Sequence, residues 1–464
     1  MTSSLNCGVA IVGGGPGGVD AALACAGRGL DVLLVEERDL GGVCLNRGCI
    51  PTKLYLAAIA PLAELKAQAK YKLYPADTAS ASTAGFSMPA LLARKNRLIT
   101  GLRQATAKRL MEAGVRVLQG RATLSSPTSL LVASEDGENE VAFNHAIIAT
   151  GSHPAYPPGL EPDNNRVLGS TQLLDLEEAP ERLLVIGAGA VGLELAGFFH
   201  ALGTKVSIVE AQDRLAPVED PDVSTLIERL LKREKYSLYI GSPGVNLARD
   251  EHEVRLTLAS GEVVVAEKCL VALGRRANTA NLGLDVLGVE PGNAGFLATD
   301  EYLRVSDAVL AIGDVNGRWL LAHAAQHQGE YAARFLAKET SEPYDAGPMP
   351  SCVYGPVESF RAGKSQAELT AQGGEIAVSR ENLPANPMAQ AHGGSQGFVK
   401  VLWQDGRVAG ITGAGHGVTA MASMASAIVA SAWTGEQAQH FVFPHPGLDE
   451  TLKQALLTPQ ELLA

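Results

Sequence analysis

Two cysteines, Cys44 and Cys49, lie five positions apart in the segment GGVCLNRGCIPTK. On a regular α-helix this spacing would separate the two side chains by about 140° around the axis and about 7.5 Å along it. A disulfide needs Cα atoms within roughly 7 Å, so the backbone between them must be irregular, as Gly48 permits. Pro51 suits a first helical turn, which places Cys49 near a helix N-terminus, where the dipole stabilises a thiolate. The pair predicts reversible thiol–disulfide chemistry.

Two other interpretations of the pair are ordinary buried cysteines and half of a zinc site. Zinc-binding cysteines are usually separated by roughly two to four residues and accompanied by a second ligand pair, which this sequence lacks. The remaining cysteines are isolated and are interpreted as inert core thiols: Cys7, Cys25, Cys269 and Cys352. We therefore expect no bound metal.

Two glycine-rich turns each follow a short apolar strand, at residues 9–12 and 183–186, and precede a helical stretch. In a dinucleotide-binding turn the first glycine allows the tight bend, the second lets the backbone approach a pyrophosphate, and the third lets helix pack on strand. The two sets are Gly13, Gly15 and Gly18, and Gly187, Gly189 and Gly192. A glutamate ends an apolar strand 23 residues after each first glycine, at Glu36 and Glu210. Such a carboxylate can bind both ribose hydroxyls, so two dinucleotide folds are expected.

Glu210 also bears on the choice of nicotinamide cofactor. A carboxylate there would repel the extra phosphate of NADP while accepting hydrogen bonds from an unmodified ribose, which favours NAD. Arg214 is close in sequence and could contact a phosphate, so NADP stays open as the alternative.

The composition indicates an ordinary globular protein of two to four domains, because 464 residues exceed the roughly 250–300 that one core supports. A net charge of −12 without a basic run argues against nucleic acid as a partner. Residues 54–111 have helical spacing, interrupted near residues 78–85. The uncharged stretch 408–435 is interpreted as a strand, a glycine turn and a buried helix rather than a membrane span. No secretory signal is recognisable, and a cytoplasmic location is expected.

The segment GGVCLNRGCIPTK, placed between two such turns, resembles the active-site segment of the pyridine nucleotide-disulfide oxidoreductases. The resemblance extends over the chain through IIATGS, RLLVIGAGAVGLELA, VALGRRANT, AIGDV, LLAHAAQHQG and FPHPGLDE. It implies an α/β fold with two Rossmann-like dinucleotide-binding domains, for FAD and NAD, plus a C-terminal α+β dimerisation domain. The implied divisions are an FAD-binding domain at 1–152, an NAD-binding domain at 153–273, a central domain at 274–344 and a dimerisation domain at 345–464.

The resemblance also implies roles for individual residues. Cys44 would be the interchange thiol that faces the substrate, and Cys49 the thiolate that contacts the flavin. Lys53 and Glu194 correspond to an ion pair beside the flavin ring. His445 corresponds to the catalytic base and Glu450 to the carboxylate that holds its other nitrogen, a pairing that fixes the tautomer and raises basicity. The remaining cofactor-binding positions implied by the matched motifs are Thr150, Gly151, Gly274, Asp314 and Ala322.

Within that family the cysteine segment is most similar to enzymes that oxidise protein-bound dihydrolipoamide. The implied partner is a lipoyl-bearing protein of a 2-oxoacid dehydrogenase or glycine-cleavage complex. The implied assembly is a homodimer whose active sites are shared, with an uncharged helix over residues 419–433 at the interface. The alternatives are a disulfide reductase similar to glutathione reductase and, in another class, a redox-silent flavoprotein scaffold.

Three features depart from the family pattern. Arg47 lies between the cysteines, where the family usually has an apolar residue, and the hypothesis is that its charge lowers a thiolate pKa. The segment around Tyr354 lacks the usual Thr-x-Pro, and the segment around Gly413 replaces an acidic helix with small apolar residues.

Overall fold

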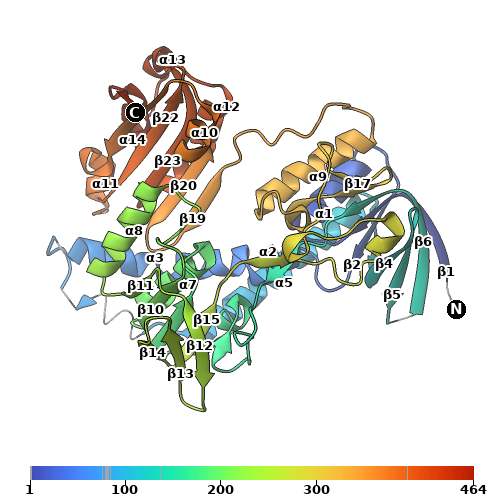
Figure 1. The fold of residues 1–464 in the computed structure, drawn as a ribbon, viewed down its shortest axis with the longest axis horizontal. Helices are drawn as coiled ribbons and strands as arrows, with labels where there is room; N and C mark the ends of the chain where they lie inside the picture. The colour runs from blue at the N-terminus through green and yellow to red at the C-terminus, as the bar shows by residue number, and fades with distance from the viewer. Residues whose placement is uncertain are drawn as a thin grey trace. The chain divides into compact units, whose positions relative to one another are not determined.

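The computed structural model describes residues 3–69, 71–75, 77–78, 83, 85–135, 137–393 and 396–463. These residues form two compact units, each assembled from segments that are distant in sequence (Figure 1). The first unit combines Met1–Pro51, Ala93–Ala155 and Gly274–Ala346, and the second combines Thr52–Leu92, Tyr156–Leu273 and Gly347–Ala464. The predicted interruption near residues 78–85 lies largely outside the described residues, and the four-domain division stays a prediction.

The first unit is built on an eight-stranded sheet. Its main strand order is β17-β18-β6-β1-β2-β3, and β5 and β4 continue the sheet from β6. The strands from β18 to β3 run parallel, and all five residues of β2 are buried, as expected for a sheet covered on both faces. The strands are β1 (Ser3–Val12), β2 (Val32–Glu36), β3 (Arg116–Gln119), β4 (Arg121–Ser126), β5 (Ser129–Ser134), β6 (Gly137–Ile148), β17 (Arg304–Ser306) and β18 (Val309–Ala311).

Helices α1 (Pro16–Ala26) and α9 (Ala322–Leu336) pack closely in this unit. A Cβ on Gly17 would lie 3.1 Å from the Cβ of Ala325, and a Cβ on Gly329 would lie 2.8 Å from the carbonyl oxygen of Gly17. Glycine therefore sets the distance between the two helices. The other elements of this unit include α2 (Gly42–Arg47), β7 (Ser152–Pro154), β16 (Arg275–Ala277), η1 (Leu284–Leu287), η2 (Asn293–Gly295) and η3 (Gly313–Asn316). Helices α3 (Cys49–Ala69) and α5 (Met88–Glu112) have residues in both units.

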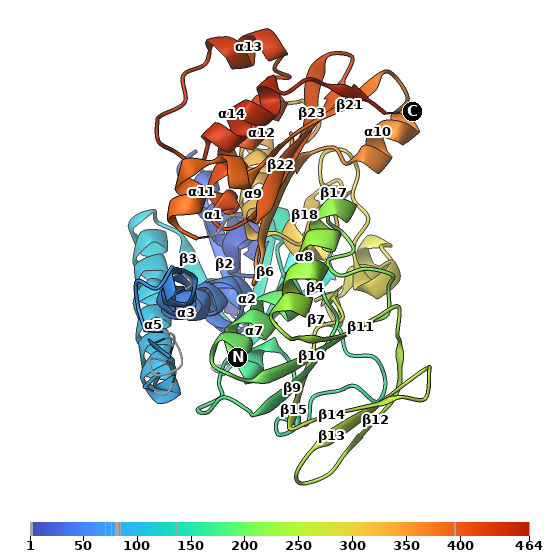
Figure 2. The ribbon, with the colours of Figure 1, turned by 90° about the vertical axis from the view of Figure 1, so that its left-hand side faces the viewer.

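The second unit contains a five-stranded parallel sheet in the order β11-β10-β9-β15-β8. Figure 2 labels four of these strands, β11, β10, β9 and β15. Helix α7 follows β9 through the second glycine turn, so both predicted strand–turn–helix units are present. A small antiparallel sheet, β12-β13-β14, packs beside it through buried aliphatic side chains. The elements are β8 (Val167–Leu168), α6 (Ser170–Leu173), β9 (Arg182–Ile186), α7 (Ala190–Ala201), β10 (Lys205–Glu210), α8 (Pro221–Arg233), β11 (Ser237–Ile240), β12 (Gly244–Arg249), β13 (Val254–Leu258), β14 (Val263–Ala266) and β15 (Lys268–Val271).

The C-terminal part of the second unit is a six-stranded sheet in the order β19-β20-β23-β22-β21-β24, with every pair antiparallel. Helices α12 and α14 pack on it and enclose one apolar core. The elements are β19 (Ser351–Tyr354), β20 (Glu358–Gly363), α10 (Gln366–Gln372), β21 (Ile376–Asn382), η4 (Leu383–Ala385), α11 (Pro387–Ala391), β22 (Gly397–Gln404), β23 (Arg407–Gly415), η5 (Val418–Met421), α12 (Ala422–Ala430), α13 (Gly435–His440), α14 (Glu450–Leu457) and β24 (Glu461–Leu462).

The strand, glycine turn and helix predicted for residues 408–435 are confirmed as β23, a turn at Gly417, and α12. The uncharged helix predicted over residues 419–433 was too long. Its first residues form the 3-10 turn η5, and Ala432 adopts a φ of 45°, which cannot continue a right-handed helix. Only α12, from Ala422 to Ala430, is α-helical.

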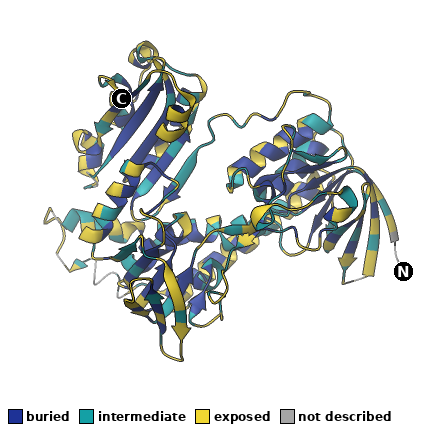
Figure 3. Ribbon diagram, viewed as in Figure 1, coloured by how far each residue is buried: buried dark blue, intermediate teal, exposed yellow. Residues whose placement is uncertain are grey.

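The central strands β22 and β23 of the six-stranded sheet are almost entirely buried, and this sheet is largely dark blue in Figure 3. Strands β3 and β12 have no buried residue. Across the part of the chain that the structure describes, none of the helices combines the length and the apolar character needed to cross a bilayer.

One buried ion pair connects α8 to the six-stranded sheet. Lys400 on β22 lies 2.6 Å from Asp220, and both side chains are almost completely buried. Asp220 also caps α8 by accepting a hydrogen bond from the N–H of Asp222. The pair therefore anchors the start of this helix on the sheet.

Removing one partner of such a pair leaves a buried charge without its counter-ion. We expect Lys400→Met to lower the free energy of unfolding by about 3 kcal/mol, measured by urea denaturation. Lys364→Met removes a lysine that bonds Gln372 at the surface, and it should change the free energy far less. Equal effects of the two substitutions would contradict the anchoring role.

Candidate active site

The cysteine pair spans a break between two helices. Helix α2 ends at Arg47, Gly48 has φ −133° and ψ −108°, and α3 begins at Cys49. A Cβ on Gly48 would lie 3.1 Å from the carbonyl oxygen of Val43, so little space is left for a side chain. The irregular backbone predicted between the cysteines is confirmed, and Cys49 is at the N-terminus of a helix.

The two thiols interact with each other. Cys44 is half-buried and Cys49 is exposed. The pKa of Cys44 is raised, first by its hydrogen bond to Cys49, then by burial, and more weakly by the carboxylate of Asp314. Arg47 forms an ion pair with Asp39 instead, with 3.7 Å between Nη2 and Oδ2. Cys44 therefore keeps its proton at neutral pH, and the Arg47 charge is directed to a carboxylate.

The first glycine turn joins β1 to α1. Gly13 adopts φ +107°, and a Cβ there would lie 2.4 Å from the carbonyl oxygen of Ala149. A Cβ on Gly18 would lie 1.8 Å from the carbonyl oxygen of Gly13, so the helix packs directly on the turn. Gly15, at the N-cap of α1, faces open space within 4 Å. The helix N-terminus is thus accessible to an anionic group.

The residues around this turn fit an FAD. Glu36 ends β2, and its carboxylate accepts hydrogen bonds from the N–H of Gly14 at 2.6 Å and of Arg38 at 2.7 Å. The hydroxyl of Thr150 is buried and has no hydrogen-bond partner among the described residues. An open helix N-terminus suits a pyrophosphate, the fixed carboxylate suits ribose hydroxyls, and the unpaired hydroxyl can serve a bound ligand.

Asp314 lies in η3, directly after the buried strand β18. Its carboxylate accepts a hydrogen bond from the hydroxyl of Ser152. Arg275 Nε donates to the same hydroxyl at 2.6 Å and lies 3.4 Å from Asp314 Oδ2. Ser152 and Arg275 belong to the predicted motifs, but the sequence did not single them out as the residues that orient Asp314.

Three more predicted cofactor-binding residues lie in the first unit. Gly151 adopts φ +70° and Gly274 adopts φ +105°, both with open space where a side chain would be. The carbonyl oxygen of Gly274 accepts a hydrogen bond from Ala155 beside the paired strands β7 and β16. Ala322 is the first residue of α9. The first unit therefore contains the cysteine pair and most of the residues predicted for FAD.

The second glycine turn repeats the geometry of the first. Gly187 adopts φ +101°, and a Cβ there would lie 2.4 Å from the carbonyl oxygen of Ala272. A Cβ on Gly192 would lie 2.0 Å from the carbonyl oxygen of Gly187, whereas Gly189, at the N-cap of α7, faces open space. Glu210 ends β10 and is almost completely buried.

The Glu210 carboxylate is fixed by two backbone groups. It accepts hydrogen bonds from the N–H of Ala188 at 2.8 Å and of Gln212 at 2.9 Å. These residues fit an NAD in the same way that the first turn fits FAD. The guanidinium of Arg214, which the sequence offered as a possible contact for a cofactor phosphate, donates a hydrogen bond to the carbonyl oxygen of Pro217 at 2.6 Å.

Lys53 and Glu194 form the predicted ion pair within the second unit, with 2.5 Å between Nζ and Oε2. Glu194 is buried and also accepts a hydrogen bond from the N–H of Tyr354 at 3.0 Å. The ammonium of Lys53 lies 4.6 Å from the centroid of the Tyr354 ring. Tyr354 is a contact that sequence reasoning missed, because the segment was noted only as a departure from the family pattern.

His445 and Glu450 also meet in the second unit. His445 Nδ1 lies 3.0 Å from Oε1 and 3.1 Å from Oε2 of Glu450, and the histidine side chain is 73% exposed. The N–H of Gly447 donates to the same carboxylate at 3.0 Å. The backbone hydrogen bond of Gly447 and the neighbouring His445 hold the pKa of Glu450 below its usual range. The carboxylate therefore stays charged at neutral pH and fixes the ring.

Comparisons with protein families cover almost the whole chain. Residues 8–329 match the model of the pyridine nucleotide-disulphide oxidoreductases, and residues 349–456 match the dimerisation domain of the same family.

Individual relatives agree with the family models. The chain is 34% identical to a dihydrolipoyl dehydrogenase of Chlorobaculum parvum, over 98% of this chain and 97% of the relative. It is 31% identical to that of Bacillus subtilis, over 97% and 98% of the two chains.

Two solved structures have the same fold. LpdA from Mycobacterium tuberculosis aligns with a TM-score of 0.89 at 25% identity, over 97% of this chain and 99% of LpdA. The Cu(II) complex of the HOCl-induced flavoprotein disulfide reductase RclA from Escherichia coli aligns with a TM-score of 0.85 at 24% identity, over 98% and 99% of the two chains.

The contact between the thiols generates a testable prediction. Because the hydrogen bond to Cys49 is the largest cause of the raised Cys44 pKa, Cys49→Ala should move the pH midpoint of Cys44 alkylation to lower pH. The measurement is iodoacetamide labelling of the reduced protein across a pH series, with Cys44 quantified by peptide mass spectrometry.

Arg47→Leu is the matched control, since Arg47 pairs with Asp39, and it should leave the midpoint unchanged. A midpoint that moves in Arg47→Leu but not in Cys49→Ala would reverse the assignment of causes.

Proposed function

Because this chain belongs to the pyridine nucleotide-disulphide oxidoreductase family, we propose that it oxidises the dithiol of protein-bound dihydrolipoamide and reduces NAD. The family is that of flavoprotein disulfide oxidoreductases with an α/β fold, and its cofactors are FAD and NAD, as the sequence predicted. The observation that carries the proposed substrate is the Cys44–Cys49 pair across the Gly48 break, in a chain aligned almost end to end with dihydrolipoyl dehydrogenases.

The proposed reaction begins at the oxidised cysteine pair. A substrate thiolate attacks Cys44, the Cys44–Cys49 bond breaks, and Cys49 leaves as a thiolate. The second substrate thiol then closes the substrate disulfide and releases Cys44. Of the two substrate protons, one ends on Cys44, whose raised pKa suits a thiol, and the other is accepted by the base. Two electrons have then moved from the substrate to the pair.

The position of Cys49 supports its assignment as the thiolate. It is the first residue of the 21-residue helix α3, whose dipole stabilises negative charge at that end. The S–H of Cys44 is the neighbouring hydrogen-bond donor. The residues of the first glycine turn would hold FAD, which would supply the two-electron chemistry that links the reduced pair to NAD.

Lys53 is proposed to present its charge to the flavin ring, as family resemblance suggests. Glu194 and the ring of Tyr354 hold the ammonium on two sides, which restricts its position. The buried Glu194 carboxylate is itself fixed by the N–H of Tyr354. We interpret Glu194 and Tyr354 as positioning residues for Lys53.

His445 is proposed to be the base that removes a proton from the substrate dithiol. The charged Glu450 accepts a hydrogen bond from Nδ1, which leaves Nε2 as the nitrogen that exchanges protons. The ring is mostly exposed, as a base that serves an external substrate must be.

The assembly and its setting are part of the proposal. The chain carries the family's dimerisation domain over residues 349–456, and we propose a homodimer with a lipoyl-bearing protein as its electron donor. The four domains predicted from the sequence, including the central one at 274–344, are proposed as its organisation. A cysteine pair that alternates between disulfide and dithiol is the kind of disulfide found in a reducing compartment, where disulfides are catalytic rather than structural, so we propose a cytoplasmic location.

The substrate proposal is tested by measuring two reactions of the purified holoenzyme: the oxidation of dihydrolipoamide by NAD or NADP, and the reduction of glutathione disulfide by NADPH. We expect NAD reduction by dihydrolipoamide to exceed NADP reduction at least tenfold, because the fixed Glu210 carboxylate repels the additional phosphate. NADPH oxidation by glutathione disulfide should be negligible. Turnover of glutathione disulfide without turnover of dihydrolipoamide would replace the proposed substrate with the glutathione reductase alternative.

Sharing of the active site between two subunits gives a quantitative prediction. A heterodimer of one Cys44→Ser chain and one His445→Ala chain would have one doubly damaged site and one intact site. After random reassociation, an equal mixture should contain about half heterodimers and recover about a quarter of wild-type activity. The measurement is NAD reduction after mixing, with heterodimers quantified by differential tags. Heterodimers that form but stay inactive would exclude a shared site.

A further inference from the structure

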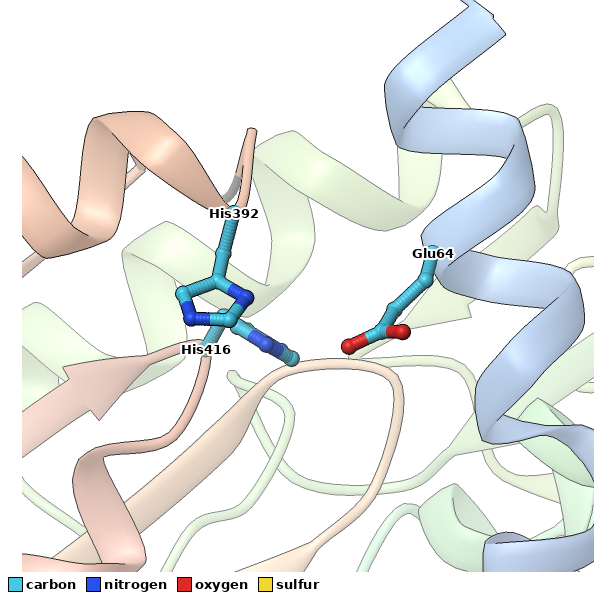
Figure 4. A group of neighbouring side chains, drawn as sticks. All are labelled: Glu64, His392 and His416. Carbon is cyan, nitrogen blue, oxygen red and sulfur yellow. The ribbon is translucent and has the colours of Figure 1, made fainter. Parts of the chain in front are cut away.

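Three side chains from distant parts of the sequence point toward one another on the surface of the second unit (Figure 4). They are Glu64 near the end of α3, His392 at the end of α11, and His416 after β23. One ligand atom from each lies within 4.8 Å of the other two, and all three residues are exposed. The centroids of the two imidazole rings are 6.1 Å apart.

The backbone around these residues is held in place. Gln68, one turn after Glu64, donates a hydrogen bond to the carbonyl oxygen of Ala391 at 3.2 Å. Gly393 adopts φ +69°, and a Cβ there would lie 3.2 Å from the Cβ of Ala67, so the chain after His392 lies against α3. The helix and the end of α11 are therefore joined independently of any ligand.

His416 also lies near a second carboxylate. Its Nδ1 lies 3.9 Å from Oε1 of Glu358, which is fixed by the N–H of Gly417 at 3.0 Å and the hydroxyl of Thr419 at 2.6 Å. A carboxylate that hydrogen-bonds the second nitrogen of a metal-binding histidine fixes its tautomer and raises its basicity. Glu358 is beyond hydrogen-bond distance at 3.9 Å, but it could take this position if the ring of His416 turned toward it.

From this arrangement we propose that Glu64, His392 and His416 form a binding site for a divalent transition-metal ion of the Zn²⁺ type. Two imidazoles and one carboxylate are a ligand set that zinc accepts, with a fourth position for water. The set contains too few oxygen ligands for Ca²⁺ and too much nitrogen for Mg²⁺.

The site needs only a small adjustment to bind an ion. Ligand atoms at about 2.1 Å from one tetrahedral ion would be about 3.4 Å apart, so the most widely spaced atoms would have to approach by at most about 1.4 Å. Exposed side chains reach such positions by small χ rotations. The three ligands come from separate segments of the second unit, so a bound ion would cross-link α3 to the six-stranded sheet.

The test is isothermal titration of the oxidised holoenzyme with Zn²⁺, because closing the cysteine pair removes the competing thiolates. Wild type should bind one Zn²⁺ per chain at this site, and His392→Ala, His416→Ala and Glu64→Gln should each weaken that binding at least tenfold. The matched control is His252→Ala, which removes an exposed histidine from a turn elsewhere in the second unit and should leave the affinity unchanged.

Thermal unfolding provides a second readout. Zn²⁺ should raise the midpoint of wild type and of His252→Ala, and the increase should disappear in His392→Ala and on addition of EDTA. The proposal is overturned if Zn²⁺ binding survives the substitutions of Glu64, His392 and His416. It is equally overturned if no saturable binding of Zn²⁺ to the oxidised protein is seen.

Discussion

The interruption of the helix at Gly48 is the constraint on which the chemistry of this chain depends. A continuous helix would turn Cys44 and Cys49 away from each other, whereas the break lets the thiols meet and restarts the helix at the second cysteine. One backbone feature therefore creates both the bond-forming distance and the electrostatic difference between the thiols. The half-buried thiol of Cys44 keeps its proton, and the exposed thiol of Cys49 is at the positive end of a helix dipole.

The first glycine turn positions this break. The N–H of Gly41 donates to the carbonyl oxygen of Gly14 at 2.7 Å, and a Cβ on Gly42 would lie 2.8 Å from the Cα of Gly15. The start of α2 is thus packed against the glycine turn that is proposed to bind the pyrophosphate. Cofactor binding and thiol geometry share one rigid support in the first unit, so a ligand in the turn and the sulfur atoms are placed by the same backbone contacts.

Local patterns in the sequence were sufficient for the features that depend on a few neighbouring residues. The spacing of the cysteines, the two glycine turns and the pairing of His445 with Glu450 could all be predicted, because each is set within one or two elements. The helix over residues 419–433 was misjudged in length, since composition does not reveal that Ala432 takes a left-handed conformation.

Contacts made by tertiary folding could not be predicted in the same way. Tyr354 meets Lys53 across about 300 positions, and Ser152 meets Arg275 across 123. The three side chains Glu64, His392 and His416 share no local pattern, so the sequence indicated no metal site.

The two glycine turns carry a further consequence for inherited variation. Every missense change in a glycine codon adds a side chain, and the effect differs between the glycines of one turn. At Gly18 or Gly192 the new atom would collide with backbone and damage the fold, whereas at Gly15 or Gly189 it would enter open space. Alleles that change Gly15 or Gly189 would therefore encode folded proteins that bind one of the two cofactors poorly. Inherited variants within one six-residue motif would then fall into two classes, those that lower stability and those that lower cofactor binding.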